Sequence, residues 1–166
     1  FRGTAIMGAV AAIDIALYDI KGKHFEVPAW ELLGGNVRDK IRLHLRSGGG
    51  TPEANFASAK AAVEEGFTAV KFDPLPGGYQ DMAQARLIDT AVEITAAARE
   101  AGGPDLDLII ELPRKLTPMV ALDLADALKP FHVLFLEDPI QIDSISSQAP
   151  ISAKSSLPFG NGERFV

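Results

Sequence analysis

The sequence contains no cysteine, which excludes a disulfide framework, a thiolate metal site and a cysteine nucleophile. It has no Lys/Arg-rich run and a formal net charge of -6, so a nucleic-acid or anionic-membrane surface is not its main function. Its most apolar stretch, residues 5–20, is too short for a membrane span, is interrupted by Asp14 and Asp19, and lacks the basic start of a signal peptide. We therefore expect a cytoplasmic protein that acts on a small molecule and holds any metal through oxygen or histidine ligands.

Two nucleotide-binding signatures are also missing. No GxGxxG follows the first predicted strand and no GxxxxGK[ST] occurs, because the glycines at residues 48–50 lack that spacing. The hydrophobic content of 47% and the charged content of 23% are nevertheless typical of a globular protein with a buried core. The usual dinucleotide and P-loop signatures of open α/β sheets are therefore absent.

The N-terminal segment has the apolar spacing of a helix. Large apolar residues recur at intervals of four and three, which places one narrow stripe on a helix over residues 5–21. Gly22 marks the expected end of this helix, and Pro28 begins a short segment that Gly34 and Gly35 close. We assign residues 1–36 to this unit and its linker.

The rest of the chain alternates short apolar strands with helices. Strands are predicted at residues 41–45, 68–72, 106–112, 133–137 and 157–162, and helices at 52–65, 80–101, 118–128 and between 142 and 154. Thr117 is the expected N-cap of the third of these helices, with Pro118 in its first turn. Five strands with intervening helices predict an α/β fold with a parallel sheet built from βαβ units.

A doubly wound open sheet and a (β/α)8 barrel both fit this alternation. The chain begins with Phe1 rather than Met and ends just after its fifth predicted strand, whereas a barrel needs about 250 residues. We therefore expect that both ends are cut, and we favour a partial (β/α)8 TIM barrel of about five strands over residues 37–166.

Three glutamates end successive predicted strands. Glu111, Glu137 and Glu163 are spaced 26 residues apart, which is one strand-helix unit each time. A single glutamate there could simply be a polar residue where a buried strand meets a loop. Three at equivalent places on neighbouring strands instead converge on one point, where their carboxylates would suit a hard cation such as Mg²⁺. Lys71 ends the preceding strand, and its ammonium would lie beside the same point or remain solvated.

The segments around these residues resemble the mandelate racemase type of enolase-superfamily enzyme. Ala-Ile-Asp-Ile-Ala-Leu-Tyr-Asp-Ile-Lys-Gly-Lys at 12–23 and Glu-Leu-Leu-Gly-Gly at 31–35 are similar to the passage from the capping domain into the barrel. Leu-Glu-Asp-Pro at 136–139 and Gly-Glu-Arg-Phe at 162–165 resemble the metal motifs of the fourth and fifth barrel strands. The resemblance implies that residues 1–36 contain the last helix of a capping domain and that residues 37–166 are the N-terminal part of the barrel.

Two further motifs look like the sugar-acid dehydratase branch, which includes galactonate-dehydratase-like enzymes. They are Lys-Phe-Asp-Pro at 71–74 and Glu-Leu-x-Arg-x-Leu-Thr-Pro at 111–118. The resemblance implies Mg²⁺ on Glu111, Glu137 and Glu163, with Lys71 as a catalytic residue. It also implies removal of the proton alpha to a carboxylate, an enediolate that Mg²⁺ stabilises, and loss of the β-hydroxyl. We expect a homo-oligomer at full length and a chain that is inactive alone.

Several residues depart from that branch. Asp73 stands where many relatives have a second lysine base, and Pro113, which cannot transfer a proton, stands where the branch often has a histidine. The family's His or Asp-His base would lie beyond residue 166. His24 and His132 match no catalytic position of the family, and His44 is the one histidine that could face the site from the first strand.

Two other functions stay open at this stage. A racemase or cycloisomerase of the same superfamily is disfavoured because no second lysine follows Lys71. A non-catalytic metal-binding relative is favoured only by Pro113. The sequence does not identify the sugar acid, because specificity in this fold comes largely from other loops.

Overall fold

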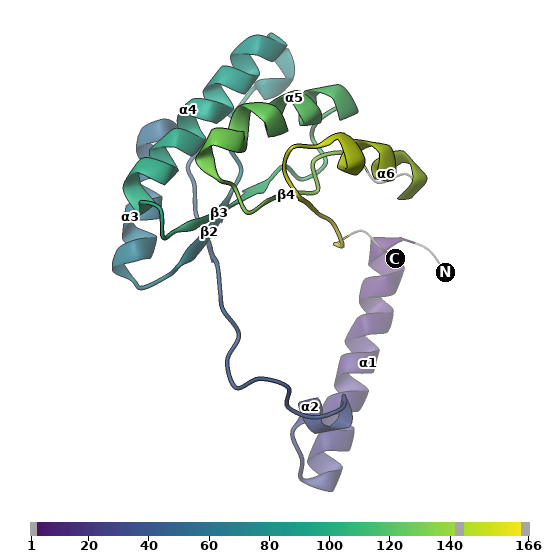
Figure 1. Cartoon of the computed structure of the whole chain (residues 1–166). Coiled ribbons are helices and arrows are strands. Elements are labelled where there is room, and N and C mark those ends of the chain that lie inside the picture. The colour runs from purple at the N-terminus through teal and green to yellow at the C-terminus, as the bar shows by residue number, and fades with distance from the viewer. Residues whose placement is uncertain (1–2, 142–144, 164–166) are drawn as a thin grey trace. The chain divides into compact units, whose positions relative to one another are not determined.

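The computed structural model describes residues 3–141 and 145–163 (Figure 1). Contacts divide the chain into two units, one built on the N-terminal helices and one, Leu43–Gly162, built on a sheet. In the described part of the chain, no helix combines the length and the apolar character that a membrane crossing requires.

The N-terminal unit is built on α1 (Thr4–Phe25), beside which α2 (Ala29–Leu32) packs. The predicted helix over residues 5–21 is confirmed, but it continues through Gly22 to Phe25. Gly22 is buried inside the helix, where a Cβ atom would lie 2.8 Å from the carbonyl oxygen of Val27. The glycine therefore permits close approach of the following loop instead of ending the helix, which ends at Glu26 with a left-handed φ of 57°.

The second unit contains a five-stranded parallel sheet. Its strands follow chain order: β1 (Leu45–Arg46), β2 (Ala69–Phe72), β3 (Asp107–Glu111), β4 (Phe135–Glu137) and β5 (Phe159–Gly160). A doubly wound sheet reverses its strand order at a switch point, and this sheet has no reversal. The strand order confirms the α/β fold with part of a TIM barrel.

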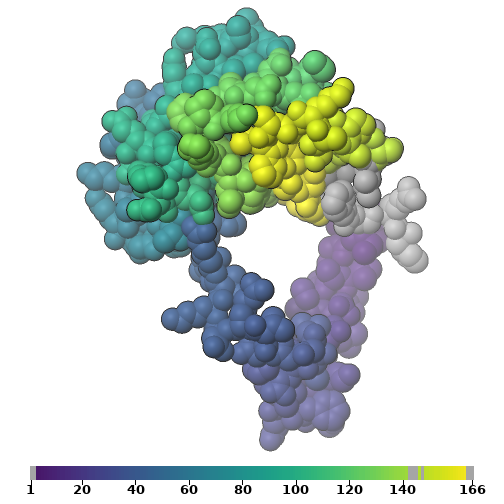
Figure 2. Space-filling model, viewed as in Figure 1, coloured from purple at the N-terminus to yellow at the C-terminus, as the bar shows by residue number. Residues whose placement is uncertain are grey.

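The helices of this unit cover one face of the sheet. They are α3 (Pro52–Glu64), α4 (Gln84–Gly102), α5 (Pro118–Leu128) and α6 (Ile145–Lys154), with 3-10 turns η1 (Tyr79–Asp81) and η2 (Lys129–Phe131). Figure 1 shows α3, α4 and α5 along the same side of the sheet, and α4 lies against α5 in the space-filling view (Figure 2). The side chain of Thr117 caps α5 as predicted, by accepting a hydrogen bond from the backbone N–H of Val120.

The core lies between the sheet and these helices. Val70, Phe72, Leu108, Ile110 and Leu136 point toward the helices and are almost fully buried. Because side chains alternate along a strand, Lys71, Ile109, Glu111 and Glu137 belong to the opposite face. The alternation therefore separates an apolar helix-facing layer from a face that carries charge at its C-terminal edge.

Arg99 ties the opposite, N-terminal edge of the sheet together. Its Nη1 donates to the carbonyl oxygens of Gly103 at 2.7 Å and Leu106 at 2.6 Å, while Nε and Nη2 donate to that of Phe131 at 3.1 and 2.9 Å. Burial lowers the pKa of the guanidinium, and nearby Asp107 partly opposes that shift. One side chain on α4 thus joins the loops that lead into β3 and β4.

Several predicted boundaries differ from the structure, two of them by four residues. Residues 41–44, expected in the first strand, lie outside the sheet and are exposed, since pairing of β1 with β2 begins only at Leu45. The helix expected from residue 80 begins at Gln84, because Met82 has extended backbone after η1. The expected helix between 142 and 154 is observed as α6, and residues 142–144 lie outside the described residues.

Candidate metal centre

Two of the three predicted metal ligands end adjacent strands. Glu111 is the last residue of β3, Glu137 is the last of β4, and the two are paired directly in the parallel register. The Glu111 side chain is 10% exposed and that of Glu137 is 22% exposed. Parallel pairing at the strand ends therefore gathers two carboxylates at the C-terminal edge of the sheet.

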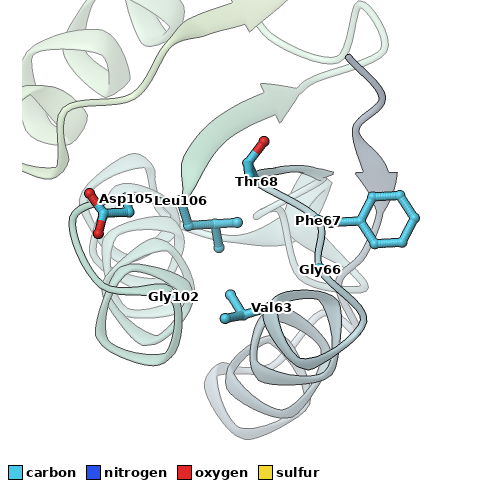
Figure 3. A pocket seen from close by; sticks show the side chains of 7 residues that line it. All are labelled: Val63, Gly66, Phe67, Thr68, Gly102, Asp105 and Leu106. Carbon is cyan, nitrogen blue, oxygen red and sulfur yellow. The ribbon is translucent and has the colours of Figure 1, made fainter. Parts of the chain in front are cut away.

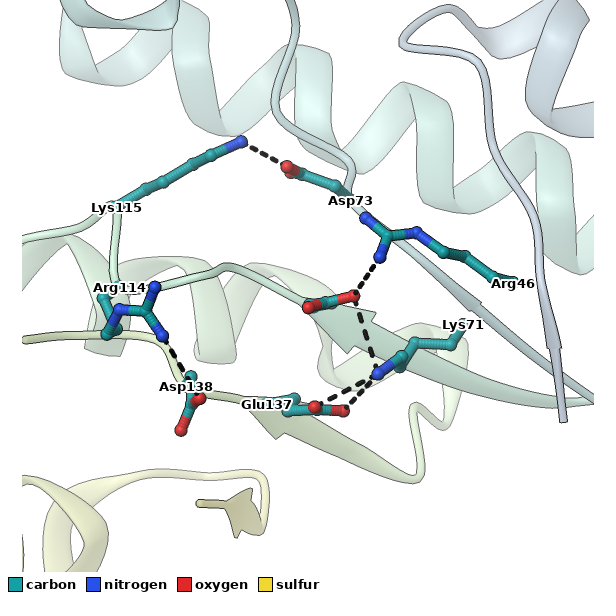
Figure 4. Close-up of polar contacts among 8 residues, drawn as sticks. Arg46, Lys71, Asp73, Arg114, Lys115, Glu137 and Asp138 are labelled. Carbon is teal, nitrogen blue, oxygen red and sulfur yellow. Dashed lines mark hydrogen bonds and ion pairs between the residues drawn. The ribbon is translucent and has the colours of Figure 1, made fainter. Parts of the chain in front are cut away.

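The Lys71 ammonium lies beside both of these carboxylates. Its Nζ donates to both carboxylate oxygens of Glu137 at 3.1 Å and lies 3.6 Å from Oε2 of Glu111 (Figure 4). Its side chain is 16% exposed, so the three charges interact in a poorly solvated place, where their attraction is less weakened by water than it would be at the surface. The ammonium offsets the repulsion between the two glutamates.

Glu163 follows β5 by three residues, in a turn, and is exposed. One carboxylate oxygen from each of Glu111, Glu137 and Glu163 lies within 4.8 Å of the other two. Two oxygens on opposite sides of a Mg²⁺ ion are about 4 Å apart, given ligand distances of about 2.1 Å. Small side-chain rotations would close that gap, and three hard carboxylate donors fit Mg²⁺ or a similar divalent cation.

A second cation, Arg46, reaches the same cluster. Its Nη1 lies 3.7 Å from Oε2 of Glu111 (Figure 4), and β1 pairs it in register with Lys71. Arg46 is not among the site residues predicted from the sequence, because the first strand was expected to end at residue 45. Its strand-end position is the signal that could have found it, since this is also the position of Lys71 relative to the site.

The packing beneath Glu137 requires a glycine on the neighbouring strand. Gly160 of β5 pairs with Glu137, and a Cβ atom at Gly160 would lie 2.7 Å from the ring of Phe135. Phe135 and Glu137 share a face because they are two residues apart on β4. The ring thus occupies the space beside Gly160, directly below the carboxylates.

The loops after β3 and β4 hold each other in strained conformations. Arg114 has a φ of 63° and Asp138 a φ of 43°, both in the left-handed region that non-glycine residues rarely adopt. The N–H of Arg114 donates to the carbonyl oxygen of Asp138 at 2.7 Å, and the N–H of Asp138 donates to that of Gly160 at 2.9 Å. The Arg114 guanidinium also lies 3.9 Å from the Asp138 carboxylate. These contacts fix the chain immediately beyond Glu137.

Asp73, which replaces a lysine of many relatives, is engaged by its neighbours. Its Oδ2 accepts a hydrogen bond from Lys115 Nζ, and its Oδ1 accepts one from the N–H of Leu75 at 2.9 Å (Figure 4). Lys115 also lies over the Tyr79 ring, with Nζ 5.3 Å from the ring centre. This pair links the loops after β2 and β3. Both carboxylate oxygens of Asp73 are thus used in contacts that hold these loops.

The histidines are placed as follows. His44 is exposed and precedes β1, outside the sheet. His132 ends η2 just before β4, at the N-terminal edge and away from the carboxylates. His24 lies in α1, where its ring meets that of Phe25 edge to face. His44 was expected within the first strand, and this placement is wrong because β1 begins at Leu45.

A hollow of about 210 Å³ lies at the opposite edge of the sheet from the carboxylates (Figure 3). Val63, Phe67, Gly102 and Leu106 are among its lining residues, all of them just before β2 or β3. Active sites of TIM barrels lie at the C-terminal ends of the strands. The hollow therefore lies at the N-terminal edge of the strands, which in this fold contributes to stability and does not carry the active site.

Family models match most of the chain. Residues 56–166 match the model "Enolase C-terminal domain-like", and residues 2–34 match "Mandelate racemase / muconate lactonizing enzyme, N-terminal domain". The first match covers more than half of the sequence, and the second lies N-terminal to it.

Known proteins agree with these models. The D-galactonate dehydratase of Klebsiella pneumoniae (strain 342) is 34% identical over 98% of this chain and 42% of its own length, and that of Xanthomonas euvesicatoria pv. vesicatoria (strain 85-10) is 38% identical over 99% and 43%. A crystal structure of a mandelate racemase/muconate lactonizing enzyme from Jannaschia sp. CCS1 superposes with a TM-score of 0.90 at 32% identity, covering 100% of this chain and 46% of that one. The chain thus spans less than half the length of these relatives, and it belongs to the mandelate racemase and muconate lactonizing enzyme family of the enolase superfamily.

Proposed function

We propose that this chain carries the metal site of a Mg²⁺-dependent dehydratase of sugar acids. The observation that carries the proposal is the pairing of Glu111 and Glu137 at the ends of adjacent strands. One carboxylate oxygen of Glu163 lies within 4.8 Å of an oxygen of each, and the Lys71 ammonium lies beside the paired carboxylates. Relatives named D-galactonate dehydratase, 34% and 38% identical, support the reaction class. The proposed domain boundary lies between residues 36 and 37.

Glu111, Glu137 and Glu163 would hold the divalent cation, one oxygen from each. A bound cation supplies positive charge where the substrate carboxylate becomes an enediolate, which makes the neighbouring C–H acidic enough to lose its proton. In the structure, the Lys71 ammonium donates hydrogen bonds to both carboxylate oxygens of Glu137. If Glu137 held a cation, the Lys71 ammonium would be able to donate a hydrogen bond to a substrate carboxylate oxygen as negative charge grows on that oxygen.

The reaction removes one water from the acid. A base takes the proton from the carbon next to the carboxylate, the hydroxyl on the following carbon leaves with a proton as water, and the resulting enol tautomerises to a 2-oxo-3-deoxy acid. Pro113 cannot donate the proton to the leaving hydroxyl. Asp73 is held by Lys115 and by the Leu75 N–H. We therefore assign to this chain the binding of the metal and of the developing charge, and no proton transfer.

Turnover of D-galactonate by the protein expressed from the complete gene tests this proposal. We expect Mg²⁺-dependent formation of a 2-oxo acid, detected as its semicarbazone, and its loss in Glu137→Gln, which keeps the side-chain shape and removes the charge. Glu93→Gln, an exposed glutamate on α4, is the matched control and should retain turnover. Interconversion of stereoisomers without water loss would instead favour a racemase, and Mg²⁺ binding without turnover of any sugar acid would favour a non-catalytic relative.

A further inference from the structure

Arg46 lies near the carboxylate cluster, but its contact with Glu111 is longer than a hydrogen bond. Its Nη1 lies 3.7 Å from Glu111 Oε2, beyond the 2.7–3.2 Å range of an N–H to O hydrogen bond. Lys71 Nζ already lies 3.6 Å from the same oxygen. Arg46 is thus a second, looser cation on a carboxylate that has a closer and more buried partner.

Arg46 is also much more exposed to solvent than Lys71. The Arg46 side chain is 74% exposed, against 16% for Lys71 and 10% for Glu111. A guanidinium has five N–H donors in a planar fork that matches a carboxylate, and no acceptor. Most of the Arg46 fork therefore faces solvent at the mouth of the cluster, where an incoming anion would meet it.

Arg46 makes the charge of the cluster more favourable to an anionic ligand. Among the described residues named here, the three glutamates with Lys71 and Arg46 carry one net negative charge. A divalent cation would change this to one net positive charge, which a single substrate carboxylate would neutralise. Without Arg46, the same count would give a neutral metal-loaded cluster, which would attract the acid less strongly.

We infer that Arg46 anchors the carboxylate of a polyhydroxy acid at the metal-loaded site and so selects acids over neutral sugars. The inference rests on the proposed function and names the residue of that site that recognises the substrate class. In the metal-free state Arg46 stays near Glu111. With Glu111 holding a cation, the Arg46 guanidinium would donate to the acid from the strand beside Lys71.

Isothermal titration calorimetry on the protein expressed from the complete gene separates the two bindings. Mg²⁺ is titrated first, and D-galactonate is then titrated at saturating Mg²⁺, with D-galactose as the neutral probe. In Arg46→Gln we expect the dissociation constant for D-galactonate to rise about 10- to 100-fold, the value of one charge-assisted interaction. The Mg²⁺ affinity should stay within about threefold or improve, because a competing cation has been removed.

Two further variants complete the test. Arg46→Lys keeps the charge but loses the fork, so its D-galactonate affinity should fall between those of the wild type and Arg46→Gln. Arg86→Gln removes an exposed arginine on α4 and should leave both affinities unchanged.

The outcomes distinguish this inference from the proposed function. Unchanged D-galactonate affinity in Arg46→Gln, beside normal Mg²⁺ binding, overturns the inference and leaves the metal site intact. A loss of Mg²⁺ affinity as large as the loss of D-galactonate affinity also overturns it, because Arg46 would then act by positioning Glu111. Absence of Mg²⁺ binding by the wild-type protein refutes the proposed function itself.

Discussion

Replacement of Lys71 by methionine should destabilise the metal-free protein and make its stability strongly dependent on Mg²⁺. The Lys71 ammonium is the closest positive charge to both paired glutamates, at 3.1 Å from Glu137 and 3.6 Å from Glu111. Methionine keeps the approximate length of the side chain and removes the charge. In its absence two poorly solvated carboxylates face each other, and folding is opposed by their repulsion.

The structure sets the expected magnitude. Removing one partner of a buried ion pair costs about 3–5 kcal/mol. Because these side chains are 10–22% exposed and water screens part of the repulsion, we expect about 2 kcal/mol in the free energy of unfolding. Saturation with Mg²⁺ at a hundred times its dissociation constant adds roughly 2.7 kcal/mol to the native state, which offsets that loss. At one common Mg²⁺ concentration, the gain should be larger in Lys71→Met than in the wild type, because the lysine competes with the metal.

Urea unfolding with and without Mg²⁺ measures both effects. The matched control is Lys60→Met, because Lys60 lies 3.9 Å from Glu64 on the exposed face of α3 and such surface pairs contribute about 0–1 kcal/mol. If Lys71→Met loses no more stability than Lys60→Met, or if Mg²⁺ stabilises the two variants equally, then the arrangement of charges described here is wrong.

Two further predictions concern the support of the site. Gly160→Ala should lower the free energy of unfolding by about 1–3 kcal/mol, since the new Cβ would lie 2.7 Å from the Phe135 ring. Gly77→Ala is the control and should change the stability little, because Gly77 has open space around it. Equal effects of the two substitutions in thermal unfolding would contradict this packing. Arg99→Met should cost roughly 3 kcal/mol through the carbonyl oxygens it leaves without a donor, against little change for Arg86→Met. Because burial lowers the pKa of Arg99, the unfolded chain binds that proton more tightly, so this group makes stability rise with pH only in the alkaline range. A steep dependence near neutral pH that disappears in Arg99→Met would show that the assignment is wrong.

Local sequence patterns predicted the elements and the strand-end positions of Glu111 and Glu137. Apolar runs placed β2, β3 and β4 within a few residues, and Thr117 and Pro118 fixed the start of α5. A regular strand-helix period carries residues at equivalent strand ends to the same edge of the sheet, and for that reason the spacing of Glu111 and Glu137 was informative.

Contacts that depend on register and loop conformation were not predictable from the same patterns. Arg46 meets Glu111 across an intervening strand, so its role depends on where β1 begins to pair. The left-handed conformations of Arg114 and Asp138 accompany hydrogen bonds between two loops. Aspartate adopts this region more often than most non-glycine residues, but arginine has no such preference. Lys115 and Asp73 are likewise brought together only by the fold.

The central claim is that Glu111, Glu137 and Glu163 share one divalent cation, and calorimetric titration of Mg²⁺ into the wild-type chain and Glu137→Gln tests it most directly. We expect one Mg²⁺ per chain in the wild type and an affinity at least about tenfold weaker in Glu137→Gln, since a tenfold change corresponds to only about 1.4 kcal/mol. Glu93→Gln, which removes the same charge from the exposed face of α4, should bind Mg²⁺ as the wild type does. Equal Mg²⁺ affinity in the wild type and Glu137→Gln would contradict the metal site and, with it, the proposed dehydratase.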